Sequence, residues 1–220
     1  MTADLRHQVV ELGASLFSRR LTFGRTGNIS VRLGDDILVT PTGASLGALT
    51  ADELSTIDVA GRHVGGPKPS KEAFLHAAVY RARPDAGAVV HLHSTYSVAV
   101  SCLAGLDPTD VLPPLTAYYV MRVGRLPLLP YHAPGDDALE PLAEHTARAD
   151  HAFLLANHGP VVAGADLSTA ADAMEELEET ARLFLLLDGH QTRPLTPQQV
   201  TDLRARTARS SVPASEGAIR

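Results

Sequence analysis

The stretch that most constrains the fold is 88–101, AVVHLHSTYSVAVS, in which an apolar, β-branched run delivers His91 and His93 and then stops at Ser94. In a strand the side chains at i and i+2 point to the same face, so both imidazoles can reach one point, as two ligands of a metal ion do. Ser94 is a candidate N-cap for a helix beginning near Thr95, which would leave the histidines at the carboxyl end of a buried strand, where sites in α/β proteins commonly lie. The motif alone leaves a second interpretation open, in which one histidine packs in the core and the other faces solvent.

The composition limits the classes of function. The 220 residues fit one large domain, and the net charge is −6 with 19 dispersed lysines and arginines, so no basic stripe indicates nucleic-acid binding. No apolar run approaches the roughly 18 residues that span a bilayer. The opening MTADLRHQVVELG is an amphipathic helix pattern rather than a signal peptide, so we expect a cytoplasmic protein with no membrane partner. The single cysteine, Cys102, excludes an internal disulfide and is expected to be a buried structural thiol.

Hydrophobic periodicity and turn residues predict helices and strands along the whole chain. Helices are expected at 3–20, from Ser70 as N-cap to Pro84, at 95–103, at 117–123, from Asp136 to 149, at 169–187 after Ser168 as N-cap, and from Thr196 and Pro197 onward. Strands are expected at 28–33, 37–40, 55–59, 88–93, 126–130 and 152–163, the last with a break at 157–160. No repeat or linker divides the chain, so we expect a single domain over residues 1–207 and a disordered tail over 208–220.

Three segments bear on the binding of an anion. Two of them, 25–28 and 40–43, are rich in glycine, threonine and asparagine, and their N–H groups and hydroxyls could form an anion-binding nest, although ordinary turns are the simpler explanation of these two alone. The third is Ser70, Lys71 and Glu72 at the expected start of a helix, where free N–H groups and the positive end of the helix dipole favour an anion. Glu72 either stabilises that dipole or serves as a carboxylate ligand or proton carrier beside the histidine strand.

Two further histidines occupy suggestive positions. His158 lies in the break of the last predicted strand, at a hairpin tip or strand end from which it can reach a metal. His76 follows Glu72 by one helical turn and could orient that carboxylate, or it could pack against the sheet.

Five motifs occur in a fixed order: GNIS at 27–30, TPTG at 40–43, KPSKE at 68–72, HLHS at 91–94 and NHG at 157–159. In this order they resemble the class II aldolase family, which includes the fuculose-phosphate aldolases and the adducin head, and the resemblance covers about residues 5–190. It implies an α/β fold of three α/β/α layers with a central, mainly antiparallel sheet. It also implies a cyclic homotetramer whose active sites lie between neighbouring subunits.

The resemblance implies roles for individual residues. His91, His93 and His158 match the residues that bind a divalent metal, usually Zn²⁺ with Mn²⁺ or Co²⁺ as alternatives, one ion per subunit. Glu72 matches the acid that is the fourth ligand when the site is empty and the proton-carrying base when substrate enters. Tyr119 aligns with a tyrosine that lines the active site, although a core aromatic on a helix explains it equally well. The residues that match the phosphate-binding positions are Gly27, Asn28, Thr42, Gly43, Ser70 and Lys71.

Departures from the pattern indicate the branch of the family. In the aldolases a tyrosine near the C-terminus of a neighbouring subunit protonates an aldehyde oxygen, and this sequence has no tyrosine after Tyr131. The pentulose-phosphate 4-epimerases carry aspartate where Glu72 stands, and a non-catalytic adducin-like scaffold would lack metal ligands that are all present here. Lys71 in the KPSKE motif, where sugar-phosphate aldolases usually carry a second serine, and the stretch HLHSTYSVAVS at 91–101 most resemble the 3-oxo-tetronate 4-phosphate decarboxylases.

That branch implies metal-dependent decarboxylation of a small phosphorylated sugar acid. Loss of CO2 from this β-keto acid leaves an electron pair that passes into the C3 carbonyl, which gives a zinc-stabilised enediolate while the phosphate anchors the other end. Protonation gives dihydroxyacetone phosphate, with Glu72 as the expected proton donor and Tyr119 as a candidate helper. The first alternative is a class II sugar-phosphate aldolase, which forms the same enediolate by splitting a ketose such as fuculose 1-phosphate.

Overall fold

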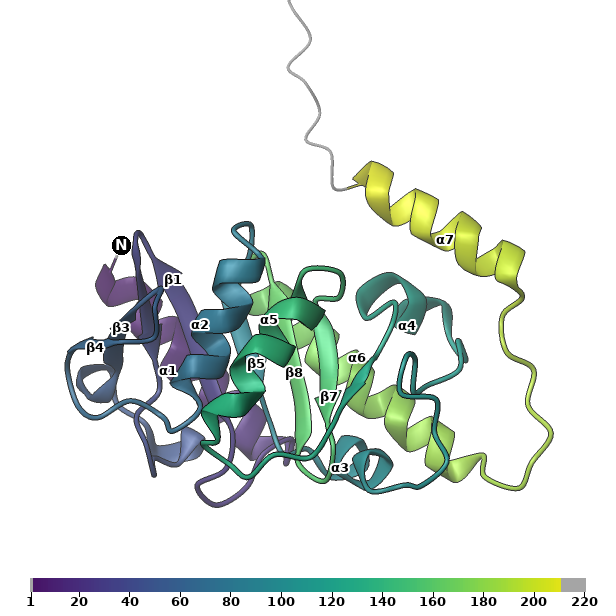
Figure 1. The fold of residues 1–220 in the computed structure, drawn as a ribbon, viewed down its shortest axis with the longest axis horizontal. Coiled ribbons are helices and arrows are strands. Elements are labelled where there is room, and N and C mark those ends of the chain that lie inside the picture. Colours follow the sequence, from purple (N-terminus) through teal and green to yellow (C-terminus); the bar gives the residue numbers. More distant parts are fainter. Residues whose placement is uncertain (1, 211–220) are drawn as a thin grey trace, which may run out of the picture.

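The fold is built on one eight-stranded sheet, seen in a computed structural model that describes residues 2–210 (Figure 1). The strand order is β4-β3-β2-β1-β5-β8-β7-β6, and every neighbouring pair is antiparallel except β6 with β7. The six predicted strands are present, the last of them as the hairpin β7–β8, and β4 is an additional edge strand. Their bounds are β1 (Asn28–Leu33), β2 (Asp36–Val39), β3 (Ser55–Asp58), β4 (His63–Gly65), β5 (Ala88–His91), β6 (Leu128–Leu129), β7 (Ala152–Leu155) and β8 (Gly159–Gly164).

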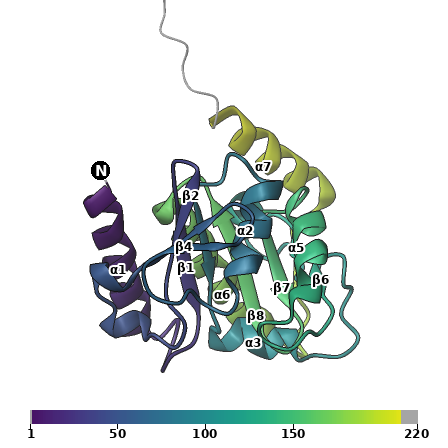
Figure 2. The ribbon, with the colours of Figure 1, turned by 60° about the vertical axis from the view of Figure 1, so that its left-hand side comes forward.

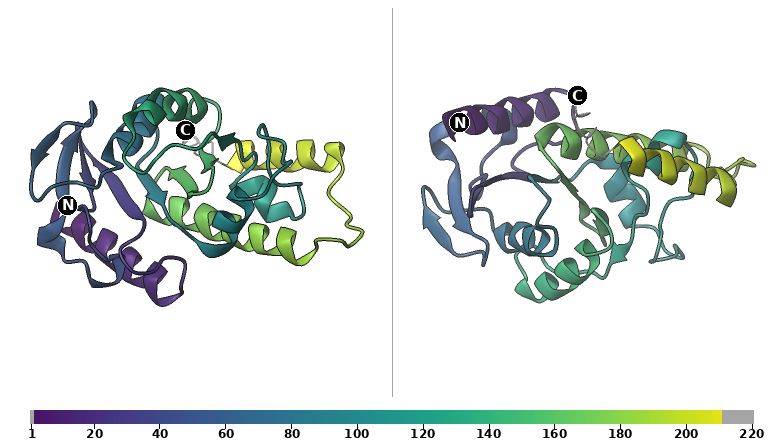
Figure 3. Two further views of the ribbon diagram at one scale, coloured as in Figure 1. Left: turned by 60° about the horizontal axis from the view of Figure 1, so that its bottom comes forward. Right: turned by 90° about the horizontal axis from the view of Figure 1, so that it is seen from above.

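Helices cover both faces of the sheet and make the three α/β/α layers that the sequence predicts. Helices α2 and α5 lie on one face, and α1, α3, α4 and α6 lie on the other, as the turned views show (Figures 2 and 3). Helix α7 packs against α4. No helix within residues 2–210 is long and apolar enough to cross a membrane. The helices are α1 (Thr2–Ser18), α2 (Ala73–Ala82), α3 (Thr95–Ser101), α4 (Ala117–Arg122), α5 (Glu140–Ala147), α6 (Leu167–Leu186) and α7 (Pro197–Ser210).

The strands alternate their side chains between two apolar cores. In β5, Ala88 and Val90 belong to the core under α1 and α6, whereas Val89 belongs to the core under α2 and α5. Burying one valine or leucine contributes about 1.5–3 kcal/mol, so a shift of one residue in the register of β5 would exchange the two faces and lose several such contributions. Because His91 follows Val89 by two residues, its side chain is fixed on the face that carries α2.

Two glycines allow the chain segments around the histidines to approach closely. A Cβ on Gly159 would lie 2.3 Å from the backbone oxygen of Leu92, so the hairpin that carries His158 can contact the end of β5 only with glycine at this position. Gly27 has φ +78°, and its Cβ would lie 2.9 Å from the backbone oxygen of His91. The NHG and GNIS motifs therefore each place a glycine against the histidine strand.

Two predicted N-caps are wrong. Helix α2 begins at Ala73 with Glu72 in the N-cap position, not Ser70, because Pro69 pairs with Pro41 in a β-bridge and the N–H of Ser70 donates to the backbone oxygen of Thr40. Those contacts hold the backbone extended up to Ser70, so the helix starts later. Helix α6 is likewise capped two residues earlier than predicted, since the side chain of Asp166, not Ser168, accepts from the N–H of Thr169.

Helix α3 is capped from a distant part of the chain. Ser94 occupies the predicted N-cap position, but its hydroxyl has no hydrogen-bond partner within the described chain. The buried carboxylate of Glu178 on α6 instead accepts from the N–H groups of Tyr96 (2.8 Å) and Ser97 (2.9 Å) and from the Ser97 hydroxyl (2.7 Å). A negative charge on the first N–H groups of a helix is a favourable cap, and it fixes α3 directly after His93.

The other predictions concern the thiol and the tail. Cys102 is exposed, so the prediction of a buried thiol is wrong; it is the residue that follows the last turn of α3 and faces away from the apolar side of that helix. The predicted tail, 208–220, lies mostly outside the described residues, and 208–210 form the end of α7.

Candidate metal centre

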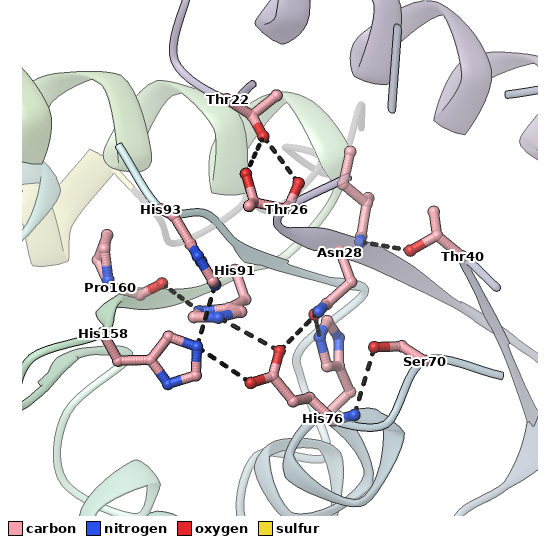
Figure 4. A network of polar contacts seen from close by, with 12 residues as sticks. Thr22, Thr26, Asn28, Thr40, Ser70, His76, His91, His93, His158 and Pro160 are labelled. Carbon is pink, nitrogen blue, oxygen red and sulfur yellow. Dashed lines mark hydrogen bonds and ion pairs between the residues drawn. The ribbon is translucent and has the colours of Figure 1, made fainter. Parts of the chain in front are cut away.

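Four side chains from separate segments meet at one point. Glu72 precedes α2, His91 ends β5, His93 follows β5, and His158 lies in the β7–β8 turn; one donor atom from each lies within 4.8 Å of the others. The Nε2 of His158 lies 3.0 Å from Nε2 of His93 and 3.1 Å from Oε1 of Glu72, and Nε2 of His91 lies 3.4 Å from Oε2 of Glu72. Figure 4 shows the three imidazoles converging. The structure thus brings together all four residues that the sequence predicts as metal ligands.

The ring of His91 is held in the orientation of a metal ligand. Its Nδ1–H donates to the backbone oxygen of Pro160 at 2.8 Å, which assigns the proton to Nδ1 and leaves the lone pair on Nε2. That Nε2 is buried and makes no hydrogen bond within residues 2–210. A buried nitrogen lone pair is costly unless something occupies it, and a backbone carbonyl on the other ring nitrogen is the usual support of a metal-bound histidine.

The donor set fits a divalent cation of the zinc type. Three imidazole nitrogens and one carboxylate match the ligands that Zn²⁺ takes in catalytic sites, where three protein ligands leave a position for water or substrate. Two Nε2 atoms 3.0 Å apart, on His93 and His158, need a proton or a cation between them. A metal ion at this point would satisfy both nitrogens and the Nε2 of His91 together.

The cluster shifts the pKa values of its members. For Glu72, burial would raise the pKa, but the charge of His91 and His158 and the hydrogen bonds from His158 and Asn28 outweigh burial and lower the pKa below its usual range. Burial, and then the charge of His91 and His158, lowers the pKa of His93 to about 4. At neutral pH Glu72 is therefore an anion and His93 is neutral, which are the forms that bind a metal.

The lowered pKa of His93 predicts that the metal-free protein loses stability in mild acid. An unfolded histidine takes up a proton near pH 6.5, whereas folded His93 does so only near pH 4, so the unfolded state binds more protons between these values. The free energy of unfolding should fall as the pH is lowered from 6.5 to 4. Thermal unfolding of chelator-treated protein across this range measures it, and His93→Gln should make the dependence less steep; an unfolding temperature that rises toward pH 4 would contradict the prediction.

A cavity opens above the cluster and is lined by the predicted phosphate-binding residues. Its wall combines turn residues, hydroxyls and two cations with three members of the cluster: Arg25, Thr26, Gly27, Asn28, Pro41, Thr42, Gly43, Ala44, Ser70, Lys71, Glu72, His93, Pro134 and His158. Arg25 was not predicted, although the segment 25–28 was. Arg25 and Lys71 are exposed, and neither side chain makes an ion pair or hydrogen bond within the described residues, so two cations remain available to an anion in this cavity.

The geometry changes how three of these residues could contact an anion. The N–H groups of Thr42 and Ser70 already donate to the backbone oxygens of Lys68 and Thr40, so these two residues offer hydroxyls rather than amides. The side chain of Asn28 is buried and is engaged with Glu72 and His76: its Nδ2 donates to Oε2 of Glu72 at 2.8 Å. Asn28 therefore directs its side chain to the carboxylate of the cluster.

Tyr119 lies apart from the cluster. It is on α4, is 1% exposed, and belongs to the core under α1 and α6, and it is not among the residues that line the cavity. Its hydroxyl has no hydrogen-bond partner within residues 2–210, and burial raises its pKa. Within one chain Tyr119 is therefore a core residue of α4, which packs on α6 and α7.

A three-layer fold with a cluster of three histidines and a glutamate, of which Glu72, His93 and His158 line a cavity walled by hydroxyls and cations, defines a class of protein that can hold a divalent cation beside a bound anion. The model of the Class II Aldolase and Adducin N-terminal domain family matches residues 7–185. The chain belongs to this family.

Individual relatives cover nearly the whole chain. A 3-oxo-tetronate 4-phosphate decarboxylase of Haemophilus influenzae is 52% identical over 199 residues, which are 90% of this chain and 95% of the relative. The enzyme of the same name from Escherichia coli K12 is 47% identical, and the match covers 92% of this chain and 96% of the length of that enzyme. Among solved structures, YgbL from Klebsiella pneumoniae superimposes with a TM-score of 0.91 at 49% identity, covering 93% of this chain and 99% of YgbL. An L-fuculose 1-phosphate aldolase has a TM-score of 0.85 at 25% identity, covering 93% of this chain and 96% of its own.

Proposed function

We propose that this chain is a lyase that converts 3-oxo-tetronate 4-phosphate to dihydroxyacetone phosphate and CO2. The observation that carries the proposal is the joining, in one cavity, of the Glu72 and histidine cluster with the hydroxyls and cations of the wall. Such a cavity suits a substrate that has oxygen atoms for a metal at one end and a phosphate at the other. Relatives that are 45–52% identical over nine-tenths of the chain carry the decarboxylase name, which supports this choice of substrate.

The cofactor we propose is one divalent cation per subunit, with Zn²⁺ first and Mn²⁺ or Co²⁺ as alternatives. His91, His93 and His158 would hold it, and Glu72 would be the fourth ligand in the absence of substrate. A bound cation supplies a Lewis acid that stabilises negative charge developing on substrate oxygens. The support is the donor set, together with the fixed tautomer and unpartnered Nε2 of His91.

The residues of the chain then have separate tasks. The phosphate binds the turn at Gly27, the hydroxyls of Thr42 and Ser70, and the cations Arg25 and Lys71, which fixes the substrate at the end remote from the reacting bond. Cleavage of the C1–C2 bond releases CO2, and its electron pair passes into the C3 carbonyl. No aldehyde oxygen is formed, so this reaction needs no acid in the position of the absent C-terminal tyrosine.

Glu72 is the proton carrier in this proposal. Its lowered pKa makes it an anion in the resting protein, so in this proposal it first takes a proton from the C2 hydroxyl of the substrate. The carboxyl then protonates C2 after CO2 has left. The one proton consumed overall comes from solvent when dihydroxyacetone phosphate departs. Tyr119 has no part in this sequence, because its ring is enclosed in the core.

The experiment that tests the function uses 3-oxo-tetronate 4-phosphate of both C2 configurations, with CO2 and dihydroxyacetone phosphate followed together. Equal amounts of both products from one configuration are expected. Fuculose 1-phosphate is the parallel substrate, since a fuculose 1-phosphate aldolase shares the fold. Aldehyde and dihydroxyacetone phosphate from this ketose, with no CO2 from either keto acid, would replace the decarboxylase by an aldolase; no product from any of them would overturn the proposal.

Arg25 should contribute to binding of the phosphate. Arg25→Ala removes a cation from the rim of the cavity, and a charge-assisted hydrogen bond is worth about 1.5–3 kcal/mol, so we expect kcat/KM to fall about 10- to 100-fold, mostly through KM. Steady-state kinetics of Arg25→Ala beside Arg20→Ala, an arginine outside the cavity, measure the effect. An unchanged KM in Arg25→Ala would show that this cation does not contact the substrate.

We also propose a cytoplasmic homotetramer with active sites at the subunit interfaces. Two exposed aromatic residues lie close in the sequence to residues that line the cavity. Phe23 (55% exposed) precedes Arg25, and Tyr131 (62% exposed) precedes Pro134. Exposed aromatic residues of this size are typical of interfaces between protein chains. Light scattering of the purified protein tests the proposal, and a monomeric mass with full activity would contradict it.

A further inference from the structure

We propose that His76 is a positioning residue that fixes Asn28, and through Asn28 the Glu72 carboxylate, in the orientation that the metal cluster requires. This inference rests on the proposed function only for its kinetic part. His76 lies on α2 and is fully buried. Its Nε2 is hydrogen-bonded to Oδ1 of Asn28, and its Nδ1 lies 2.6 Å from the hydroxyl of Ser30 (Figure 4 shows His76 beneath Asn28).

The direction of each hydrogen bond follows from one fixed end. Glu72 is an anion and can only accept, so the NH2 group of Asn28 faces it and Oδ1 of Asn28 faces His76. His76 must then donate from Nε2, which makes Nδ1 the acceptor for the hydroxyl of Ser30. The Ser30 oxygen is left to accept from the hydroxyl of Tyr80, 3.0 Å away. The chain of bonds therefore runs one way, from Tyr80 through Ser30, His76 and Asn28 to Glu72.

Nothing in this chain of hydrogen bonds can reorganise through water. Ser30 and His76 are 0% exposed, Tyr80 is 1% exposed and Asn28 is 4% exposed. Burial lowers the pKa of His76 to about 3, so the ring stays neutral with a single N–H. If the amide of Asn28 were turned over, its oxygen would face the carboxylate of Glu72, and both oxygens are acceptors. The hydrogen bond from His76 would also be lost, which is costly for buried groups. The amide is therefore held in one of its two orientations.

The consequence for Glu72 is that its two oxygens become unequal. Oε2 accepts a hydrogen bond from Asn28, whereas Oε1 lies 3.1 Å from Nε2 of His158 and accepts none from Asn28. The fixed Asn28 amide thus leaves Oε1 as the oxygen that can move a proton, while Oε2, 3.4 Å from Nε2 of His91, stays within reach of a cation held by that histidine. His76 is not itself among the residues that line the cavity, and its ring meets the site through Asn28, which is one of them.

The test compares His76→Leu, which removes the donor, with His76→Gln, which keeps an N–H that can reach Asn28. Two readouts are needed: the affinity of the metal-free protein for Co²⁺ alone, by visible absorption, and kcat and KM for the keto acid. Loss of a group that orients a metal ligand typically costs 10- to 100-fold in affinity or activity. We expect at least a tenfold loss in Co²⁺ affinity and kcat for His76→Leu, a change in KM under twofold, and recovery of most of the loss in His76→Gln.

Controls separate positioning from folding. His151→Gln alters a half-buried histidine whose ring Nε2 donates to the backbone oxygen of Arg122, away from the cluster, and it should leave both readouts unchanged. If His76→Leu fails to fold, Tyr80→Phe removes only the hydroxyl oxygen that begins this series of hydrogen bonds, and it should give a smaller loss in the same two readouts. Co²⁺ affinity equal to wild type in these folded variants overturns the inference. A wild-type protein that binds Co²⁺ but releases no CO2 overturns the decarboxylase proposal instead, and the Co²⁺ readout still decides the role of His76.

Discussion

His93→Ala is expected to abolish decarboxylation and to empty the metal site. The Nε2 of His93 lies in the cluster, and truncation to alanine leaves two imidazoles and one carboxylate to bind the ion. A bound metal contributes several kcal/mol to stabilising charge in the transition state, and each 1.4 kcal/mol is tenfold in rate, so kcat should fall by about 10³ or more. Elemental analysis of the purified variant and a CO2-release assay measure the two effects.

His93 is the histidine of the cluster whose loss can be separated from unfolding. His91 is fully buried and supports the core, whereas His93 is only half-buried and lies after the strand, so its loss should not unfold the protein. The matched control is His145→Ala, an exposed histidine on α5 that should keep a full complement of metal and wild-type kcat. Stoichiometric metal in His93→Ala, with kcat within tenfold of wild type, would show that the cluster is not the metal site of the reaction.

The parts of the site that the sequence predicts are those encoded by short-range periodicity. His91 and His93 are two residues apart at the end of a buried strand, and a period of two places their rings on one side. His158 was predicted because an Asn-His-Gly-Pro break must form a turn. The three α/β/α layers were predicted from the resemblance of the five motifs to a known family.

Contacts between distant segments could not be predicted from local pattern. The caps of α2 and α6 were wrong because β-bridge pairing at Pro69 and an earlier aspartate determined where each helix starts. Asn28 and His76 are 48 positions apart, and only the packing of α2 on β1 joins them. The segment 25–28 was predicted as a possible anion-binding turn, but Arg25 belongs to an exposed loop, and only the fold shows that its side chain lines the cavity of the cluster.

Glu72→Gln is the second change with a large expected effect, because it keeps the shape of the side chain and removes its charge. Proton transfer by a positioned side chain contributes about 10²–10⁴ in rate, so kcat should fall by that factor. The fixed donor of Asn28 also determines how glutamine sits: its oxygen must face Nδ2 of Asn28, which turns its NH2 group toward Nε2 of His158. The variant thereby places a donor where the proton-carrying oxygen stood.

Metal content distinguishes a lost proton carrier from a lost metal site. The three histidines remain in Glu72→Gln, so the variant should still bind one divalent ion with reduced affinity, in contrast to His93→Ala. Glu144→Gln is the control, since Glu144 is a carboxylate in an ion pair with Arg81 outside the cavity, and it should keep wild-type kcat. If Glu72→Gln retains kcat within threefold while Glu144→Gln behaves as expected, another group delivers the proton to C2. The exposed Lys71 at the cavity wall would then be the first residue to replace, because its ammonium group carries a transferable proton and it is not one of the proposed metal ligands.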